Sequence, residues 1–467
     1  MCVPRGCPDH NRPRRQRLTR KRWRAALAVG VLVGAVAVAG CGAESSVPIL
    51  TWYINPDDGT QAKLAEICTD QSGGRYHIRT ALLPRDSTSQ REQLVRRLAA
   101  SDSGIDLMSL DVPYLAEFAN AGFVRQFGAS ERARLTAGML GGPLASAVWD
   151  GKLFGVPFNT NTQLLWYRKS VAARAGLGVR PNTSPTWAQV IEAAERTGTT
   201  VQVQASRYEG YTVLINALVA SAGGAILENP EAGRDVQPAL ASPAGEKAAG
   251  IIRTLGRSKA ASADLNTSNE GTAQAGFLAK DGGFMINWPF VYTAESAALK
   301  GLAAQFEAAT SEAARSKLRQ AIADQEARMG DFGWTRWPSV VPGRPSAPPL
   351  GGINIAVGAF TKHPDDAVDA VRCLTSPESQ KTYMLREGLL STIQSVYDDP
   401  DIQKAFPMAD LLRQSVAEAV PRPITPYYPD ITAAIQRTWH PPASVTMRTP
   451  GESAELIMAV LHDRRLL

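Results

Sequence analysis

The segment from Ile49 to Asp111 alternates between short apolar runs and helical patterns, and this alternation constrains the fold more than any other feature of the sequence. Strands that alternate with helices are typical of a parallel sheet with crossover connections, so the sequence predicts an α/β fold. The expected order is strand 49–54, helix 60–71, strand 75–83, helix 89–100 and strand 105–110.

Polar residues follow two of these expected strands. Asn55 and Asp57 come directly after the first strand, and Asp111 ends the third. In an open α/β sheet, ligands bind just beyond the carboxyl ends of the strands. These residues are therefore candidates for one shared binding site.

The rest of the chain continues the mixed pattern. Strands are expected at 164–168 and 351–358, and a Pro-rich loop at 334–349. Long helical stretches, several of them rich in alanine, are expected at 187–197, 212–222, 245–255, 294–328 and 365–374.

The first forty residues have the layout of a signal peptide. A basic block at 12–24 precedes the uncharged apolar run 25–39, which is too short for a membrane-spanning helix. The junction Val38-Ala39-Gly40-Cys41 resembles a bacterial lipobox, whose cysteine is acylated and becomes the mature N-terminus. We therefore expect 1–40 to be a lipoprotein signal peptide and 41–47 a lipidated tether at the outer face of the cytoplasmic membrane.

This segment also explains the basic charge of the 467-residue chain. The formal net charge is +6, but residues 1–40 hold nine of the 50 Lys and Arg and one of the 44 Asp and Glu. The remainder has 41 basic and 43 acidic residues, which leaves a net charge of −2. A nearly neutral chain gives no reason to expect a nucleic-acid partner.

Two cysteines, Cys68 and Cys373, follow the expected lipidation site. Outside the cytoplasm two thiols can form a disulfide. Both also stand in helix-like segments, where a cysteine is often a small buried hydrophobe. The sequence leaves these two alternatives open.

Motifs for several kinds of chemistry are missing from the sequence. It contains no phosphate-binding G-x-x-x-x-G-K-[ST] loop, no G-x-G-x-x-G after a strand, no H-E-x-x-H and no G-x-S-x-G. We therefore expect no cofactor, no metal site and no catalytic residues. Asp111 and Glu270 could act as the carboxylate pair of a glycoside hydrolase, but carboxylates that bind sugar hydroxyls look the same in a sequence.

Five segments in order along the chain resemble the sugar-binding proteins of ABC importers, the large type that includes maltose-binding protein. They are 106–122, 151–171, 277–289, 350–383 and 422–431. Narrower motifs are similar to those of the actinobacterial trehalose-binding lipoproteins. These are Leu83-Pro84-Arg85, the run from Thr160 to Arg168, and Asn287-Trp288-Pro289.

The resemblance implies a two-lobed periplasmic-binding-protein fold that closes on a sugar between its lobes. Each lobe is expected to be a mainly parallel sheet flanked by helices. Lobe 1 would comprise 48–157 with 290–349, and lobe 2 would comprise 158–289 with 350–467.

Sugar hydroxyls both donate and accept hydrogen bonds, so side chains with two polar atoms can hold adjacent hydroxyl pairs. An aromatic ring can pack on the apolar face of a pyranose. On this basis Asp111 would accept two hydroxyls, Arg422 would form a bidentate clamp, Trp288 would stack, and Gly352 would bring its backbone close to the sugar. The candidate sugar-binding set is Asn55, Asp57, Gln90, Asp111, Asn161, Glu270, Trp288, Gly352 and Arg422.

The resulting hypothesis is a monomeric, lipid-anchored binding subunit without enzymatic activity. It would deliver a disaccharide, with trehalose favoured, to permease subunits that are driven by a cytoplasmic ATPase. The alternatives are a binding protein for maltose or other glycosides, a secreted glycoside hydrolase that uses Asp111 and Glu270, and a lipid-anchored adhesin or scaffold.

Overall fold

Three parallel strands form one side of the first sheet. A computed structural model describes residues 47–180 and 183–466, so the predicted signal peptide and Cys41 lie outside the described residues. The strand order is β2-β1-β3-β13-β6. The bounds are β1 (Ile49–Ile54), β2 (His77–Leu82), β3 (Leu107–Asp111), β6 (Val156–Asn161) and β13 (Gly351–Val357).

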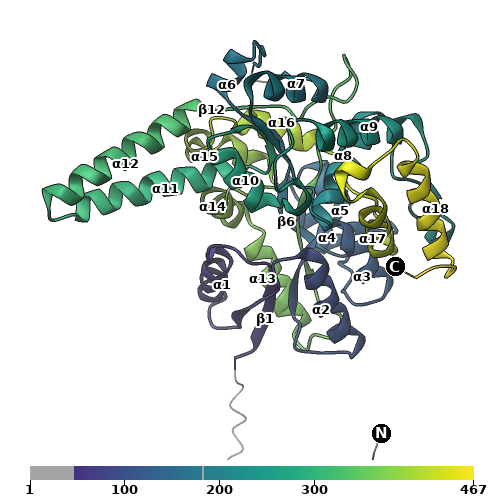
Figure 1. Cartoon of the computed structure of the whole chain (residues 1–467). Helices are drawn as coiled ribbons and strands as arrows, with labels where there is room; N and C mark the ends of the chain where they lie inside the picture. The colour runs from purple at the N-terminus through teal and green to yellow at the C-terminus, as the bar shows by residue number, and fades with distance from the viewer. Residues whose placement is uncertain (1–46, 181–182, 467) are drawn as a thin grey trace, which may run out of the picture. The chain divides into compact units, whose positions relative to one another are not determined.

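The helices α1 (Thr60–Gln71) and α2 (Ser87–Ala99) connect β1, β2 and β3, which confirms the predicted order of strands and helices (Figure 1). Polar side chains fix where each helix begins. The Asp57 carboxylate accepts from the backbone N–H groups of Gly59 and Gln61 at 3.0 and 2.7 Å, and Asp86 accepts from Ser89 at 2.9 Å. Such caps satisfy N–H groups that have no partner inside the helix.

The second sheet is buried on both faces. Its order is β12-β7-β11-β8, with β7 (Leu164–Arg168), β8 (Thr200–Gln202), β11 (Gly282–Asn287) and β12 (Phe332–Thr335). Leu165 and Ile286 belong to one hydrophobic cluster, while Trp166 and Met285 belong to another. Because successive side chains of a strand point to opposite faces, the two clusters cover the two sides of this sheet.

Helices cover both sheets. The first is covered mainly by α1, α2, α3 (Leu115–Asn120), α4 (Ala129–Leu135) and α13 (Pro364–Leu374). One face of the second carries α6 (Lys169–Arg174), α7 (Trp187–Thr197), α8 (Glu209–Ser221), α9 (Pro243–Arg257), α17 (Tyr428–Trp439) and α18 (Thr449–Leu461). The other face carries α10 (Glu270–Leu278), α11 (Phe290–Ala308), α15 (Pro400–Ala405) and α16 (Ala409–Ala417).

The remaining elements are connectors and additions. The helices α11 and α12 (Glu312–Asp331) lie side by side as a long hairpin (Figure 1). Helix α14 (Pro377–Glu387) contributes Tyr383 to the core of the first sheet and Met384 to the core on the second. The short elements are α5 (Gly141–Ser146), the pair β4 (Val148–Trp149) and β5 (Lys152–Leu153), and the pair β9 (Leu227–Glu228) and β10 (Gln237–Pro238).

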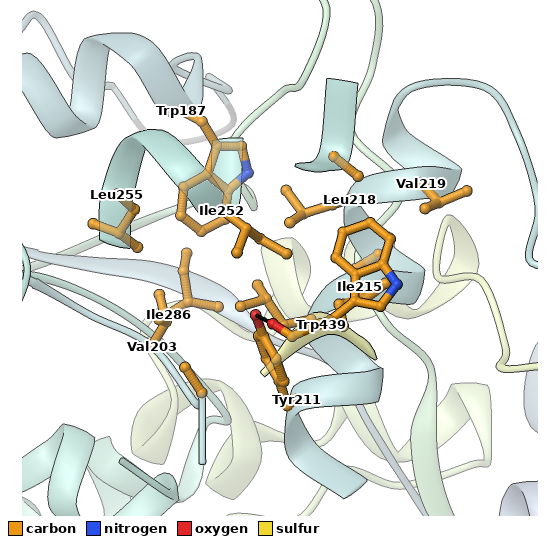
Figure 2. Packing of buried hydrophobic residues seen from close by; sticks show 14 of the residues in the cluster. Trp187, Val203, Tyr211, Ile215, Leu218, Val219, Ile252, Leu255, Ile286 and Trp439 are labelled. Carbon is orange, nitrogen blue, oxygen red and sulfur yellow. Dashed lines mark hydrogen bonds between the residues drawn. The ribbon is translucent and has the colours of Figure 1, made fainter. Parts of the chain in front are cut away.

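Large aromatic side chains fill the core on one face of the second sheet. Figure 2 shows Trp187 and Trp439 packed among Ile215, Ile252 and Ile286. Trp187 is 1% exposed and Trp439 is 0% exposed. The Tyr211 hydroxyl donates to the backbone carbonyl of Trp439 at 2.9 Å, which satisfies a polar group inside this core.

Two strands in the second half of the chain pair differently from the predicted division into lobes. Strand β12 pairs with β7 in the second sheet, although 290–349 was assigned to lobe 1. Strand β13 pairs with β3 and β6 in the first sheet, although 350–467 was assigned to lobe 2. The sequence predicted a strand at 351–358 but a Pro-rich loop at 334–349, so the strand β12 at Phe332–Thr335 was missed. Even where a strand is predicted, its apolar pattern does not specify which distant strand is the partner.

The strand directions also differ from the expectation of mainly parallel sheets. In the first sheet β13 runs antiparallel to both β3 and β6, and in the second β7 runs antiparallel to both β11 and β12. The α/β architecture with two sheets is confirmed, and both sheets are mixed. Among the described helices, none is long and apolar enough to cross a membrane.

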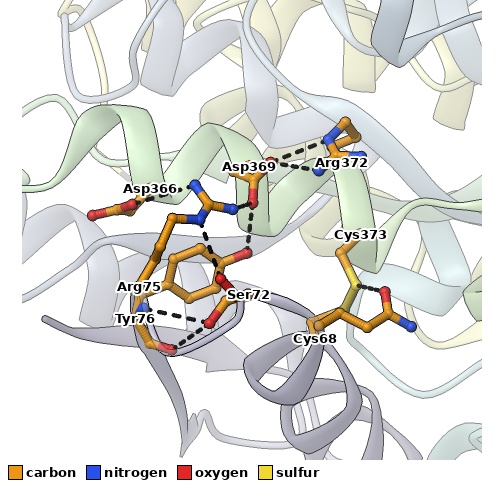
Figure 3. A network of polar contacts seen from close by, with 9 residues as sticks. Cys68, Ser72, Arg75, Tyr76, Asp366, Asp369, Arg372 and Cys373 are labelled. Carbon is orange, nitrogen blue, oxygen red and sulfur yellow. Dashed lines mark hydrogen bonds and ion pairs between the residues drawn. A yellow bond between two sulfur atoms is a disulfide. The ribbon is translucent and has the colours of Figure 1, made fainter. Parts of the chain in front are cut away.

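A disulfide between Cys68 and Cys373 joins α1 to α13 (Figure 3). The structure thereby decides between the two alternatives that the sequence left open. Beside it, the Asp369 carboxylate pairs with the guanidinium group of Arg75 and accepts from the Tyr76 hydroxyl at 3.0 Å. These contacts tie the loop after α1 to the same helix α13 that the disulfide holds.

The disulfide closes a loop of 305 residues, so its loss should destabilise the fold. A cross-link that closes such a long loop lowers the entropy of the unfolded chain. Removing a native disulfide therefore lowers the free energy of unfolding, by roughly 2–5 kcal/mol. We expect dithiothreitol to lower the urea midpoint of residues 47–467. The Cys68→Ser/Cys373→Ser variant is the control, because its midpoint should be low with and without reductant. Equal midpoints for the oxidised and reduced protein would contradict this prediction.

Candidate functional site

Two adjoining cavities lie where elements of the first and second sheets meet. The first cavity has a volume of about 280 Å³ and the second of about 460 Å³. Five residues line both of them: Arg85, Asn161, Glu270, Trp288 and Leu389. Asn161 ends β6 of the first sheet, whereas Trp288 directly follows β11 of the second. The cavities therefore have walls from both sheets, as a ligand site between two lobes requires.

The structure brings together most of the predicted site residues. The first cavity is lined by Asp111, Asn161, Glu270, Trp288, Gly352 and Arg422, and the second by Asn55 and Asp57 together with the shared residues. Gln90 lines neither cavity. It is 6% exposed within α2, and its side-chain amide donates to the Pro84 carbonyl at 2.8 Å.

An ionic cluster forms one wall of the first cavity. The two terminal nitrogens of Arg422 contact Asp111 at 2.8 and 3.3 Å, and one of them also contacts Glu209 at 2.7 Å. Arg422 and Glu209 are 4% exposed. Asp111 ends β3 in the first sheet, whereas Glu209 begins α8 on the second. Arg422 therefore connects elements of the two sheets by charge-assisted hydrogen bonds.

This cluster changes the roles predicted for Asp111 and Arg422. The bidentate partner of the guanidinium group is Asp111 itself, so Asp111 has fewer lone pairs free for a ligand than we expected. The Nε atom of Arg422 is buried without a hydrogen-bond partner and remains available as a donor in the cavity. Although burial lowers the pKa of Arg422, its carboxylate neighbours raise it further, so the guanidinium group stays charged.

Two further side chains, both on a helix that covers the second sheet, bind the Glu209 carboxylate. The hydroxyl of Tyr428 and the hydroxyl of Thr432, both on α17, donate to it, the latter at 2.8 Å. Glu209 also stands in the first turn of α8, where a negative charge is favourable. Burial raises the pKa of Glu209, and Arg422 opposes this effect.

Two consecutive glycines place the aromatic ring of Trp288. A Cβ atom on Gly351 would lie 3.0 Å from the indole ring, so the missing side chain leaves room for it. Gly352 has φ 136°, and a Cβ atom there would lie 2.5 Å from the Asn159 carbonyl oxygen. The register of β13 against β6 shifts between Ile353 and Asn354, so Gly352 comes just before an irregularity of the sheet. No other residue fits this close approach and this φ value.

Glu270 projects into both cavities from the first turn of α10. The helix is capped by Asn269, whose side chain accepts from Gly271 and Thr272 at 3.0 Å, so Glu270 is not needed as the cap. Within residues 47–180 and 183–466 its carboxylate forms no ion pair, and the Tyr208 hydroxyl and the Trp288 indole N–H are among its neighbours. Burial raises the pKa of Glu270, and these two donors oppose the effect.

Several polar residues that line the first cavity were not predicted from the sequence, and four of them stand out. These are Arg85, Asn159, Tyr208 and Glu209. Asn159 is 4% exposed and its side-chain nitrogen has no partner. It stands two positions before Asn161 in β6, so the alternation of a strand could have placed both amides on one face. Arg85 ends the Leu-Pro-Arg motif, whereas no local pattern singles out Tyr208 or Glu209.

The comparison with protein families decides what kind of protein this is. The family described as bacterial extracellular solute-binding protein matches residues 83–381. The chain belongs to this family. It is therefore an extracellular binding protein and not an enzyme, which excludes the glycoside hydrolase alternative. The described residues also hold no group of three His, Cys, Asp or Glu side chains arranged to bind a metal ion.

Several relatives of this solute-binding protein are known. It is 28% identical over 359 residues to a probable ABC transporter-binding protein of Deinococcus radiodurans, covering 74% of this chain and 76% of the relative. Its structure is similar to that of maltose-bound T. maritima MalE3, with a TM-score of 0.72 and 23% identity over 89% of this chain and 100% of the other. The GacH receptor of Streptomyces glaucescens gives a TM-score of 0.70 at 19% identity, over 89% and 98%. These structural similarities establish the two-lobed fold.

We expect the ionic cluster to contribute to the stability of the solute-binding protein even without ligand. Glu209→Ala would leave the charge of Arg422 with Asp111 alone and remove the acceptor of Tyr428 and Thr432. Breaking a buried pair in this way costs roughly 3–5 kcal/mol. Urea unfolding should show this loss, whereas Glu231→Ala, at an exposed position, should unfold like the unmodified protein. An unchanged midpoint for Glu209→Ala would refute the prediction.

Proposed function

We propose that the protein is the substrate-binding subunit of an ABC sugar importer and that it binds a disaccharide, most favourably trehalose, in the two adjoining cavities. The observation that carries this proposal is the set of free polar groups in the first cavity. The side-chain nitrogen of Asn159 and the Nε atom of Arg422 are buried there without partners, and the Glu270 carboxylate lies in the same cavity beside the Tyr208 hydroxyl. Buried polar groups need hydrogen-bond partners, and a polar ligand in the cavity can provide them.

These groups match the chemistry of a sugar. A hydroxyl can donate to the Glu270 carboxylate and accept from Asn159 or from Arg422 Nε at the same time. Trp288 offers an aromatic face to the apolar side of a pyranose, and it lines both cavities, so either ring of a disaccharide can reach it. The combined volume of about 740 Å³, which adds 280 and 460 Å³, is within the usual range of small-molecule sites.

The similar solved structures support a carbohydrate ligand, but they do not identify which sugar this protein binds. Solved structures with this fold include one with maltose and one with acarbose. Trehalose is favoured by the similarity of Leu83-Pro84-Arg85, Thr160–Arg168 and Asn287-Trp288-Pro289 to trehalose-binding lipoproteins. Maltose and other glycosides are the second candidate. The sugar would then pass to permease subunits that a cytoplasmic ATPase drives.

The ligand can be identified by calorimetric titration of residues 42–467 with trehalose, maltose, cellobiose and glucose. We expect trehalose to bind tightly and the other three to bind weakly. If maltose but not trehalose produced heat, the proposed importer function would stand and maltose would be the ligand. If none of the sugars produced heat, the carbohydrate proposal would be wrong.

Trp288→Ala and Glu270→Gln should each weaken sugar binding by more than tenfold, because one removes the stacking surface and the other the charged acceptor. Neither side chain is needed by the ligand-free fold, so the melting temperature without sugar should change little. Trp334→Ala is the matched control, since this half-buried tryptophan lines neither cavity. Normal sugar affinity in either variant would show that the cavities are not the site.

We further propose that Cys41 is acylated and anchors the monomeric protein to the outer face of the cytoplasmic membrane. Two or three acyl chains bind a bilayer stably, because each buried CH₂ group contributes roughly 0.8 kcal/mol. The full chain, expressed in a bacterium that processes lipoproteins, should partition into the detergent phase of a Triton X-114 extract. Cys41→Ser should move it to the aqueous phase, and equal partitioning of the two proteins would disprove the anchor.

A further inference from the structure

More acidic than basic side chains line the second cavity. The acidic ones are Asp57, Asp58, Glu270 and Glu387, and the basic ones are Arg85 and Arg386. Four negative and two positive charges leave a formal charge of −2 around the cavity. Both arginines are exposed to water, and within the described residues neither lies at ion-pair distance from any of the four carboxylates. The negative charge of this cavity is therefore not compensated by direct pairing.

Glu387 stands where its own helix disfavours a negative charge. It is the last residue of α14, and the carbonyl groups at the C-terminus of a helix give that end a partial negative charge. Asp57 caps the start of α1, and Glu270 stands in the first turn of α10, so both of these carboxylates lie at favourable N-terminal ends. Glu387 lacks this compensation.

The Glu387 carboxylate is nevertheless held in place at the cavity. It accepts hydrogen bonds from the backbone N–H group of Asp58 at 3.3 Å and from the hydroxyl of Thr60, so the end of α14 is joined to the start of α1. Burial raises the pKa of Glu387, and the neighbouring charges of Asp57 and Asp58 raise it further, whereas its two donors lower it. Three carboxylates therefore meet at one end of the second cavity and repel one another.

A cation would relieve this repulsion, and the lining of the cavity favours an organic ammonium group. The described residues hold no group of three His, Cys, Asp or Glu side chains arranged around one metal ion. An ammonium group donates three hydrogen bonds in different directions, so it can serve carboxylates that are not arranged around one point. Trp288 and Phe290 also line the cavity, and aromatic faces attract such cations.

From this geometry we propose that the protein prefers disaccharides that carry a protonated amino group on the ring in the second cavity, where Asp58 and Glu387 bind the ammonium group. The preference rests on the proposed sugar-binding function and adds a charged class of ligand to it. Neutral disaccharides remain ligands, because their hydroxyls can donate to the same carboxylates. A carboxylate on the same ring is disfavoured, because like charges repel.

The test is a calorimetric series on residues 42–467 with trehalose, its 2-, 4- and 6-amino-deoxy derivatives and the uncharged N-acetyl forms of these amines, at about pH 7. We expect at least one amine to bind about tenfold more tightly than trehalose in about 0.05 M NaCl, and its N-acetyl form to lose this gain. The gain should shrink in about 0.5 M NaCl, because salt screens charges. If all three amines bound no better than trehalose, the proposal would be overturned. The same series on maltose covers the second candidate sugar.

Two variants show whether the gain comes from the carboxylates. Asp58→Asn and Glu387→Gln each remove one charge and keep a side chain of nearly the same shape, so the ratio of the trehalose and amine dissociation constants should fall toward one. Asp70→Asn is the matched control, because this exposed carboxylate of α1 lines neither cavity and its loss should keep the full ratio. An unchanged ratio in the double variant Asp58→Asn/Glu387→Gln would place the amine elsewhere and refute the proposal.

The outcomes also separate this preference from the function on which it rests. If trehalose, maltose and the amines all fail to produce heat, the sugar-binding function itself has failed. If the neutral disaccharides bind and the amines gain nothing, only the charge preference has failed. The uronic acid of the same disaccharide completes the series, and an affinity equal to that of the amine would also overturn the preference, because opposite charges would then make no difference.

Discussion

The buried ion pair between Arg422 and Asp111 is the contact on which the geometry of the candidate site depends. Asp111 belongs to the first sheet, and the Glu209 carboxylate that shares the guanidinium group belongs to a helix on the second. Charges removed from water must be paired, so this contact favours holding the two parts of the protein together here. The first cavity lies directly beside this pair and takes its electrostatic character from it.

The opposite wall of the site depends on backbone geometry instead. Strand β13 comes late in the chain but inserts between β3 and β6, and its first residues, Gly351 and Gly352, lie against Trp288 and Asn159. A side chain at either glycine would displace the ring or the neighbouring strand. The close packing of Trp288 and Asn159 along this wall therefore depends on two consecutive residues that lack a Cβ atom.

The two cavities of the candidate site are joined by shared lining residues. The first combines buried donors with carboxylates, and Glu270 and Trp288 also line the second. Both polar and aromatic contacts are therefore available along the whole length of the site.

The sequence by itself determined the local structure and much of the site. Hydrophobic periodicity predicted β1, α1, β2, α2 and β3, and polar residues at strand ends predicted Asn55, Asp57 and Asp111, because both features depend on near neighbours in the chain. Only the tertiary structure decided that β13 joins the first sheet, that Cys68 meets Cys373, and that Arg422 binds Asp111 and Glu209. These contacts join residues more than two hundred positions apart, and such partners are chosen by packing and charge compensation in three dimensions.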